Sequence, residues 1–163
     1  MNYFDQTWIS VTEDLADHRN EATILTEIKR ARRIVFVAKG RVGLAARMFM
    51  QRLSQLGMHV AHSEDLLVPE LDNQDLVIFL TASGETTSSL AYLEIAKRIG
   101  VRTLAITFNA QGSISKGCDV VAEYPRPRTQ GLMKSYYEIG FIYVLERIVS
   151  QLPADQFVHT NFE

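Results

Sequence analysis

The sequence predicts an α/β fold, a single three-layer α/β/α sandwich in which helices cover both faces of a five-stranded parallel sheet. Three observations favour this class. Short apolar runs alternate with longer segments of helical spacing along most of the chain. These runs are continuously apolar, as in strands that are buried on both faces. Two turns rich in glycine or hydroxyl residues follow apolar runs, and ligands bind at such strand ends in open α/β sheets.

The elements follow in chain order. Residues 1–33 are predicted to be a helical segment, because apolar spacing from about Phe4 to Arg32 suits a helix. The sheet core spans residues 34–124 and is joined by a stiff proline-containing connector to the last helix. We expect the strands at residues 34–38, 58–62, 76–80, 102–106 and 119–123. Gly57 and Gly100 are expected to end the two helices that lie between these strands.

The last helix, residues 132–152, is apolar almost all round, and residues 153–163 form a tail. A helix on the surface of a monomer needs only one apolar stripe. The last helix is therefore predicted to face both its own sheet and another subunit, which indicates a homo-oligomer, either a dimer or a tetramer.

Composition narrows the class of protein. The chain has 163 residues, of which 47% are hydrophobic and 22% charged, as in an ordinary soluble domain. A net charge of −2 gives no electrostatic case for nucleic acid or an anionic membrane. No apolar run is long enough to cross a bilayer, and no secretory signal opens the chain. A cytoplasmic protein is expected. The single cysteine, Cys118, is interpreted as a small buried residue rather than a nucleophile.

The most informative segment follows the third predicted strand and reads Thr-Ala-Ser-Gly-Glu-Thr-Thr-Ser-Ser from Thr81 to Ser89. A helix pattern resumes directly after it. Hydroxyl groups, unpaired backbone N–H groups and the positive end of a helix dipole favour a phosphate dianion there. No Gly-Lys-Ser/Thr follows, so a small phosphorylated metabolite fits better than a nucleoside triphosphate. The candidate ligand groups are Thr81, Ser83, Gly84, Thr86 and Ser88.

Some of these residues also have a structural interpretation. Ser83 or Thr86 is a candidate N-cap of the following helix, a role compatible with anion binding. Glu85 is expected in a capping box or behind the ligand rather than against it. After the first strand, Gly40 permits close backbone approach and Arg41 supplies positive charge, whereas Lys39 fits a solvated surface charge equally well.

Four segments together resemble the sugar isomerase (SIS) domain family, and within it the 6-phospho-3-hexuloisomerases. The resemblance covers nearly the full length, and its last segment narrows the assignment most. It implies a flavodoxin-like or Rossmann-like sheet, a phosphorylated sugar such as fructose 6-phosphate as partner, and a place in formaldehyde fixation by the ribulose monophosphate pathway. The segments are Ala38–Gly43, Thr81–Thr86, Ser135–Glu138 and His159–Glu163.

The chain also departs from the family pattern. Where the family reads Gly-Ala-Gly-Arg-Ser-Gly, this chain has Ala38 for the first glycine, Lys39 for the alanine and Val42 for the serine. A serine hydroxyl is therefore missing at Val42. Ala82 stands for a glycine in Ser-Gly-Ser-Gly-Glu-Thr, and Lys134 for the glycine of Met-Gly-Ser-Leu-Phe-Glu. The phosphate site remains intact in outline, and the sugar is left open.

The implied reaction moves a carbonyl from C3 to C2 of a hexulose 6-phosphate through a 2,3-enediolate. A base must take the proton from C2 while donors stabilise the oxyanion. Glu138 is the candidate base, because apolar helix neighbours would raise the pKa of its carboxyl group; a helix-surface or subunit-bridging glutamate is the alternative. His159 is the second catalytic candidate, reaching a neighbouring subunit's site, and Ser135 is a candidate ligand contact. No metal or cofactor is expected, since the four histidines show no ligand spacing.

Two other functions remain open. One is a non-catalytic phosphosugar sensor, because the same domain serves in transcriptional regulators. A regulator would normally carry a DNA-binding helix-turn-helix domain before the sheet. Here only about 33 residues precede the first strand, and they contain no convincing basic recognition helix. The other is an isomerase of the same chemistry for a different phosphosugar. Glu146 is interpreted as a structural residue. Asp65, in the loop after the second strand, is a weaker candidate for contact with the sugar.

Overall fold

The computed structural model describes residues 1–153. Its centre is a five-stranded parallel sheet with the order β2-β1-β3-β4-β5. Each strand begins and ends within one residue of its predicted bounds, so the predicted sheet is confirmed. Strands β1 to β5 are Arg33–Val37, His59–His62, Leu76–Thr81, Arg102–Thr107 and Val120–Glu123.

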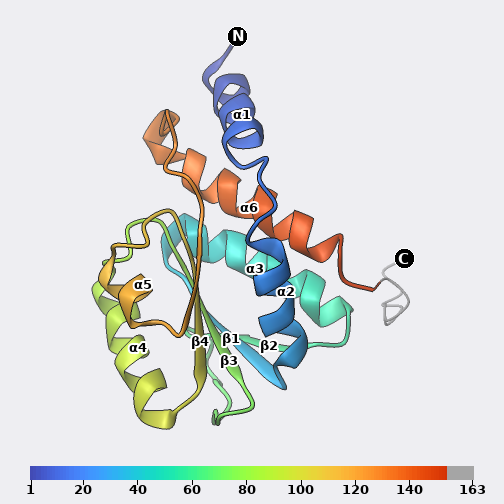
Figure 1. Ribbon diagram of the computed structural model, residues 1–163, viewed down its shortest axis with the longest axis vertical. Helices are drawn as coiled ribbons and strands as arrows, with labels where there is room; N and C mark the ends of the chain where they lie inside the picture. The colour runs from blue at the N-terminus through green and yellow to red at the C-terminus, as the bar shows by residue number, and fades with distance from the viewer. Residues whose placement is uncertain (154–163) are drawn as a thin grey trace.

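Helices cover both faces of this sheet (Figure 1). Consecutive strand residues point to opposite faces, so Ile34 and Phe36 pack into one core and Val35 and Val37 into the other. One side carries α1, α2, α3 and α6, which are Tyr3–Asp14, Glu21–Arg30, Gly40–Gln55 and Tyr136–Val149. The other side carries α4 and α5, which are Thr87–Ile99 and Ser113–Gly117. The three-layer prediction is therefore confirmed.

The N-terminal helical segment consists of two helices. Helix α1 ends at Asp14 and α2 begins at Glu21. Contacts from distant segments hold the link between them: Arg147 of α6 donates to the carbonyl oxygen of Leu15, and Asn20 donates to that of Glu123. The prediction of a helical segment did not locate this break, because helix-compatible apolar spacing occurs on both sides of it.

The last helix is shorter than predicted. Residues Leu132–Lys134 form a 3-10 turn, and α6 begins only at Tyr136. The interruption has a local cause, because Met133 and Lys134 have φ of 51° and 62°, in the left-handed region. Within the chain, α6 packs against α1, α2 and α3. Much of its apolar surface is therefore covered without a second subunit.

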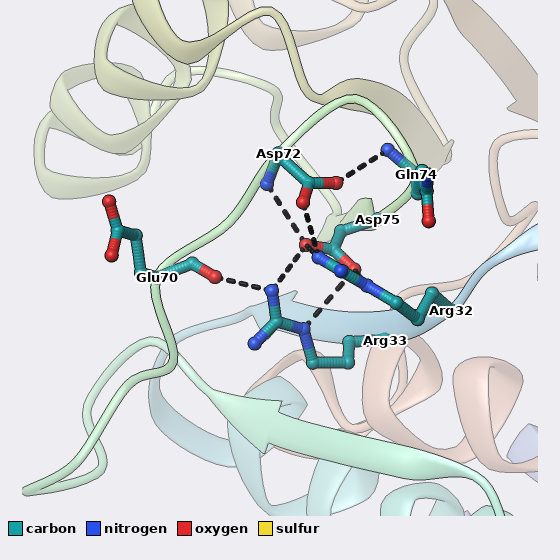
Figure 2. A network of polar contacts seen from close by, with 6 residues as sticks. All are labelled: Arg32, Arg33, Glu70, Asp72, Gln74 and Asp75. Atoms are coloured by element: carbon teal, nitrogen blue, oxygen red, sulfur yellow. Dashed lines mark hydrogen bonds and ion pairs between the residues drawn. The ribbon is translucent and has the colours of Figure 1, made fainter.

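The amino ends of β1 and β3 are joined by a network of charged side chains (Figure 2). Asp75, which precedes β3, is fully buried. Its carboxylate accepts hydrogen bonds from both guanidinium groups of Arg32 and Arg33, at 2.9–3.2 Å, and from the backbone N–H of Asp72 at 2.9 Å. Arg32 also pairs with the half-exposed carboxylate of Asp72 at 2.6 Å. Every charge in this cluster has a partner inside the protein.

Candidate functional site

A pocket of about 270 Å³ lies at the opposite, carboxyl ends of β1 and β3. Three segments form it: the turn after β1, the turn from β3 into α4, and the residues that lead into α6. Four serine and threonine hydroxyl groups, one tyrosine hydroxyl group and two ammonium groups are among its lining side chains. The lining residues are Lys39, Val42, Leu80, Thr81, Ala82, Ser83, Thr86, Ser89, Lys134 and Tyr137.

The hydroxyl groups of the β3–α4 turn are arranged as donors. Thr81 Oγ1 accepts the backbone N–H of Gly84 at 2.9 Å, and Ser83 Oγ accepts that of Glu85 at 3.2 Å. A hydroxyl that accepts one such bond still has its own proton to donate. Because a phosphate oxygen is an acceptor, both side chains are prepared to bind one.

The shape of this turn is set by a second loop, after β4. Gly84 has φ of +78°, and a Cβ there would lie 2.8 Å from the Cα of Gly112. The side chain of Asn109 donates to the carbonyl oxygen of Ser83 at 2.7 Å. Glu85 is not among the lining residues, and its carboxylate accepts the backbone N–H of Ser113 at 2.7 Å, a bond that lowers the pKa of its carboxyl group. The expectation that Glu85 supports the site from behind agrees with this geometry. Sequence analysis missed Asn109 and Gly112, since nothing local marks their contact.

The N-terminus of α4 is open toward the pocket. Thr86 is its N-cap residue, as one of the two predicted candidates, but its side chain makes no capping hydrogen bond. The first N–H groups of a helix have no partner within the helix, and the dipole favours an anion there. Ser89, buried one turn into α4, lines the pocket, whereas Ser88 is exposed and does not. The spacing i, i+3 from Thr86 was the signal for Ser89.

Two lysines bring positive charge to the pocket. Lys39 donates to Glu64 at 2.6 Å, and this bond lowers the pKa of the Glu64 carboxyl group. Lys134 is exposed and lines the pocket from the turn before α6. Within residues 1–153, Lys134 has no carboxylate within ion-pair distance. The sequence left Lys39 as either a ligand contact or a surface charge, and its place in the lining favours the first.

Glu138 lies beside this pocket rather than in its lining. Its side chain is 17% exposed, and Oε1 is 3.1 Å from Nε of Arg41. Glu138 follows Tyr137 in the chain and Arg41 precedes Val42, and both Tyr137 and Val42 line the pocket. The predicted apolar surroundings are therefore interrupted by a guanidinium group, which also donates to the carbonyl oxygen of Met133. This pair lies within one chain, so it is not the subunit bridge that was the alternative prediction for Glu138, and the catalytic role stays a prediction.

The other predicted residues have different positions. Gly40, with φ of +56°, begins α3 beside the pocket, and Ser135 is the N-cap residue of α6; neither is in the lining. Asp65 accepts the backbone N–H of His62 at 2.7 Å and pairs with Arg47 at 3.0 Å, so it ties its own loop. His159 lies outside the described residues.

Two further findings concern the described part of the chain. Burial raises the pKa of the Cys118 thiol to about 12, which is unfavourable for a nucleophile and agrees with its interpretation as a packing residue. Among residues 1–153, no helix is long and apolar enough to span a membrane, and no three side chains of histidine, cysteine or acidic type are grouped to hold a metal ion.

A pocket of similar size, about 300 Å³, lies where the chain leaves β5, between this segment and the α1–α2 link. Its arginines are engaged inside the protein: Arg19 with the carboxylate of Asp17, and Arg126 with the side-chain oxygen of Asn109. The pocket at β1 and β3 is the stronger candidate, because it joins donor hydroxyls to an open helix terminus.

Comparison with known proteins gives a family model and several relatives. The SIS domain model matches residues 27–145. An uncharacterized protein of Archaeoglobus fulgidus is 33% identical over 117 residues, which are 68% of this chain and 64% of that protein. The 3-hexulose-6-phosphate isomerase of Bacillus subtilis is 30% identical over 134 residues, which are 80% of this chain and 68% of that protein. The matched regions therefore span about two thirds of these relatives.

Solved structures share the fold. A hypothetical protein of Methanococcus jannaschii, for which a function of 3-hexulose-6-phosphate isomerase has been inferred, matches with a TM-score of 0.74 at 20% identity. The match covers 98% of this chain and 96% of that one. At this identity the likeness concerns the architecture, and it agrees with the sheet order and helical layers described above.

Proposed function

This chain belongs to the SIS domain family, and we propose that it is a sugar-phosphate isomerase that interconverts 3-hexulose 6-phosphate and fructose 6-phosphate. The observation that carries the proposal is the pocket at β1 and β3, where donor hydroxyls and an uncapped helix terminus adjoin the Arg41–Glu138 pair. A phosphate site beside a carboxylate is what an enediolate isomerase of a phosphorylated sugar requires. The name of the Bacillus subtilis relative supports the substrate.

In this proposal the phosphate group lies at the N-terminus of α4. Its oxygens accept hydrogen bonds from the hydroxyl groups of Ser83, Thr86 and Ser89, with the buried Thr81 behind them. Hydrogen bonds to a charged group are stronger than neutral ones, and the helix dipole adds to them. Binding energy from the phosphate, which does not react, then holds the reacting carbons near α6.

The proton transfer is assigned to Glu138. Its carboxylate takes the proton from C2 of 3-hexulose 6-phosphate, and the C3 carbonyl oxygen becomes the enediolate oxygen and takes up a proton. The C2 hydroxyl group then loses its proton to become the carbonyl as a proton returns to C3, which completes fructose 6-phosphate. Arg41 fixes the position of the carboxylate and supplies positive charge next to the enediolate. His159, from the tail resemblance, is proposed as the donor that assists the carbonyl oxygen.

The experiment is solvent-deuterium exchange at C3 of fructose 6-phosphate, followed by NMR in D₂O together with product formation. We expect exchange by the wild type and a loss of about 100-fold or more in Glu138→Gln. Glu146→Gln is the matched control, because Glu146 also lies on α6 and pairs with an α3 arginine, Arg52, at the same 3.1 Å. It should retain exchange within about 2-fold, since surface ion pairs contribute little.

Three outcomes would count against this assignment. Equal losses in both glutamate variants would indicate helix packing rather than a base at Glu138. Full exchange in Glu138→Gln would move the base to another residue, and His159→Gln would then be tested. Absence of exchange in the wild type, together with a fructose 6-phosphate-dependent rise in melting temperature, would instead favour the phosphosugar sensor.

We also propose that the protein is a homo-oligomer, a dimer or a tetramer. Large apolar side chains are exposed on α1, at Phe4 and Trp8, and on α3, at Leu44 and Met48. Exposed apolar groups of this kind mark interaction surfaces. Light scattering of the wild type should give a multiple of the 18.5 kDa chain mass, and Leu44→Glu/Met48→Glu should reduce it. A monomeric wild type would contradict the proposal.

A further inference from the structure

Two lysines, far apart in the sequence, reach the same pocket. Lys39 follows β1 and Lys134 precedes α6, yet both line the cavity that the β3–α4 turn completes. Both stand where the family pattern quoted above has a small residue, alanine in one case and glycine in the other. These two departures therefore change one site together, and they change it in the same electrostatic direction.

The strained backbone conformation of Lys134 indicates that its side chain has a role beside the pocket. Its φ is 62°, and that of Met133 is 51°. A residue with a Cβ in the left-handed region costs about 1–2 kcal/mol, which glycine would avoid. Strained residues persist where the surrounding structure holds them, and they cluster at ligand sites. Here Arg41 donates to the carbonyl oxygen of Met133, which fastens the strained turn beside the pocket.

The turn from β3 into α4 offers ligand groups for one phosphate without the two lysines. Four serine and threonine hydroxyls and the N-terminus of α4 are already available to that group. Arg41 is paired with Glu138, and none of the described lining residues is acidic. Glu64 only partly offsets Lys39, because its side chain is about half exposed to solvent. The ammonium group of Lys134 has no carboxylate partner within the described residues.

We propose that Lys39 and Lys134 bind a second anionic group of the ligand, a carboxylate or a second phosphate. The pocket then binds a doubly anionic phosphosugar more tightly than fructose 6-phosphate. This inference rests on the proposed phosphosugar site and narrows the chemistry of its ligand. The hydroxyls of the β3–α4 turn hold the first phosphate, and the two lysines hold the second anion at the other end of an open-chain sugar.

The test is isothermal titration calorimetry with two matched pairs of probes. Sorbitol 6-phosphate and 6-phosphogluconate share an open six-carbon chain and differ in a hydroxymethyl against a carboxylate group. Fructose 6-phosphate and fructose 1,6-bisphosphate differ in the second phosphate. We expect at least one member with a second anion to bind about 10-fold more tightly than its partner, as for one charge-assisted pair. The two pairs distinguish a carboxylate from a phosphate.

Variants locate the effect. Lys134→Met and Lys39→Met should each reduce the gain from the second anion, measured as the ratio of the two affinities within a pair of probes, to about 3-fold or less. Lys29→Met, at an exposed lysine of α2, is the control and should change neither. Glu64→Gln releases Lys39 from its partner and should increase the gain, the opposite sign. Opposite effects at two bonded residues would not arise from general damage to the fold.

The results separate this inference from the function on which it rests. Monophosphates that bind with no gain from a second anion would overturn the inference alone. Lysine variants that weaken monophosphates and doubly anionic probes equally would also overturn it, because both lysines would then hold the single phosphate. If none of the four probes binds the wild type, the phosphosugar site and this inference fail together.

Discussion

Strands β1 and β3 have a polar cluster at each end, and the two clusters differ in where their charges are paired. At the amino ends, Arg32 and Arg33 both bind the buried carboxylate of Asp75. At the carboxyl ends, the described lining of the pocket contains hydroxyl and ammonium groups and no acid. The first cluster is complete within the protein, whereas in the second, among the described residues, Lys39 pairs with Glu64 and Lys134 has no carboxylate partner.

This difference separates a structural cluster from a binding site. A buried ion pair adds little net stability, but removal of either partner is strongly destabilising, because it leaves an uncompensated charge in the protein interior. Hydrogen-bond donors that have no acceptor inside the protein contribute little to the stability of the fold. They are available to bind an anionic ligand. The shape of the carboxyl-end turn is held by the loop after β4, through the approach of Gly84 to Gly112 and the hydrogen bond from the Ser113 N–H to Glu85. Substitutions should therefore affect stability at one end and binding at the other.

The largest expected effect is at the amino end. Asp75→Asn leaves two guanidinium groups facing a neutral side chain, and the free energy of unfolding should fall by about 3 kcal/mol. Asp72→Asn, at a half-exposed carboxylate, should cost less than about 1 kcal/mol. Urea denaturation measures both. A loss in Asp75→Asn no larger than that of the control would erase the distinction between the two ends.

The same carboxylate should make the fold sensitive to acid. Burial by itself would raise the pKa of Asp75, but hydrogen bonds from Arg32 and Arg33 outweigh it and lower the pKa below its ordinary value of 3.8. A lowered pKa in the folded state stabilises the protein above the unfolded pKa, and this stability is lost as the pH falls below it. Between about pH 4 and about pH 2, the wild type should lose roughly 2 kcal/mol more than Asp75→Asn. Parallel acid profiles of the two proteins would contradict this.

A smaller effect, on binding alone, is expected at the carboxyl end. Ser83→Ala should raise the Kd for fructose 6-phosphate about 10-fold and lower the free energy of unfolding by less than about 1 kcal/mol. Ser88→Ala is the matched control, because Ser88 is exposed and lies outside the pocket lining. Calorimetry gives the affinities. Equal losses in the two variants would restore Ser88 as a ligand group, as the sequence predicted.

The smallest expected effect has the opposite sign. Lys134→Gly removes the strain at φ of 62° and should raise the free energy of unfolding by about 0.5–1 kcal/mol, net of glycine's entropy in the unfolded chain. Lys29→Gly, inside α2, should lower it by about 1 kcal/mol. Denaturation midpoints compare the two. Destabilisation in Lys134→Gly would mean that its side chain supports the fold rather than the pocket.

The sequence by itself determined the sheet, the positions of its strands and the hydroxyl-rich turn. Continuous apolar runs have few other stable arrangements, and a parallel sheet brings the carboxyl ends of its strands to one edge. The convergence of the turns at Gly40 and Thr81 followed from that rule. Glycines after α3 and α4 marked helix ends because they adopt positive φ cheaply, as Gly57 and Gly100 do.

The tertiary structure alone decided the contacts between segments that are distant in the sequence. No local pattern indicates that Arg41 pairs with Glu138, that Gly112 supports the turn at Gly84, or that Lys134 reaches the pocket of Lys39. The break between α1 and α2 has the same origin, since α6 and β5 hold the link. Periodicity reports which face of a segment is buried. The partner that covers that face, and the charges left without one, depend on how all the segments pack together.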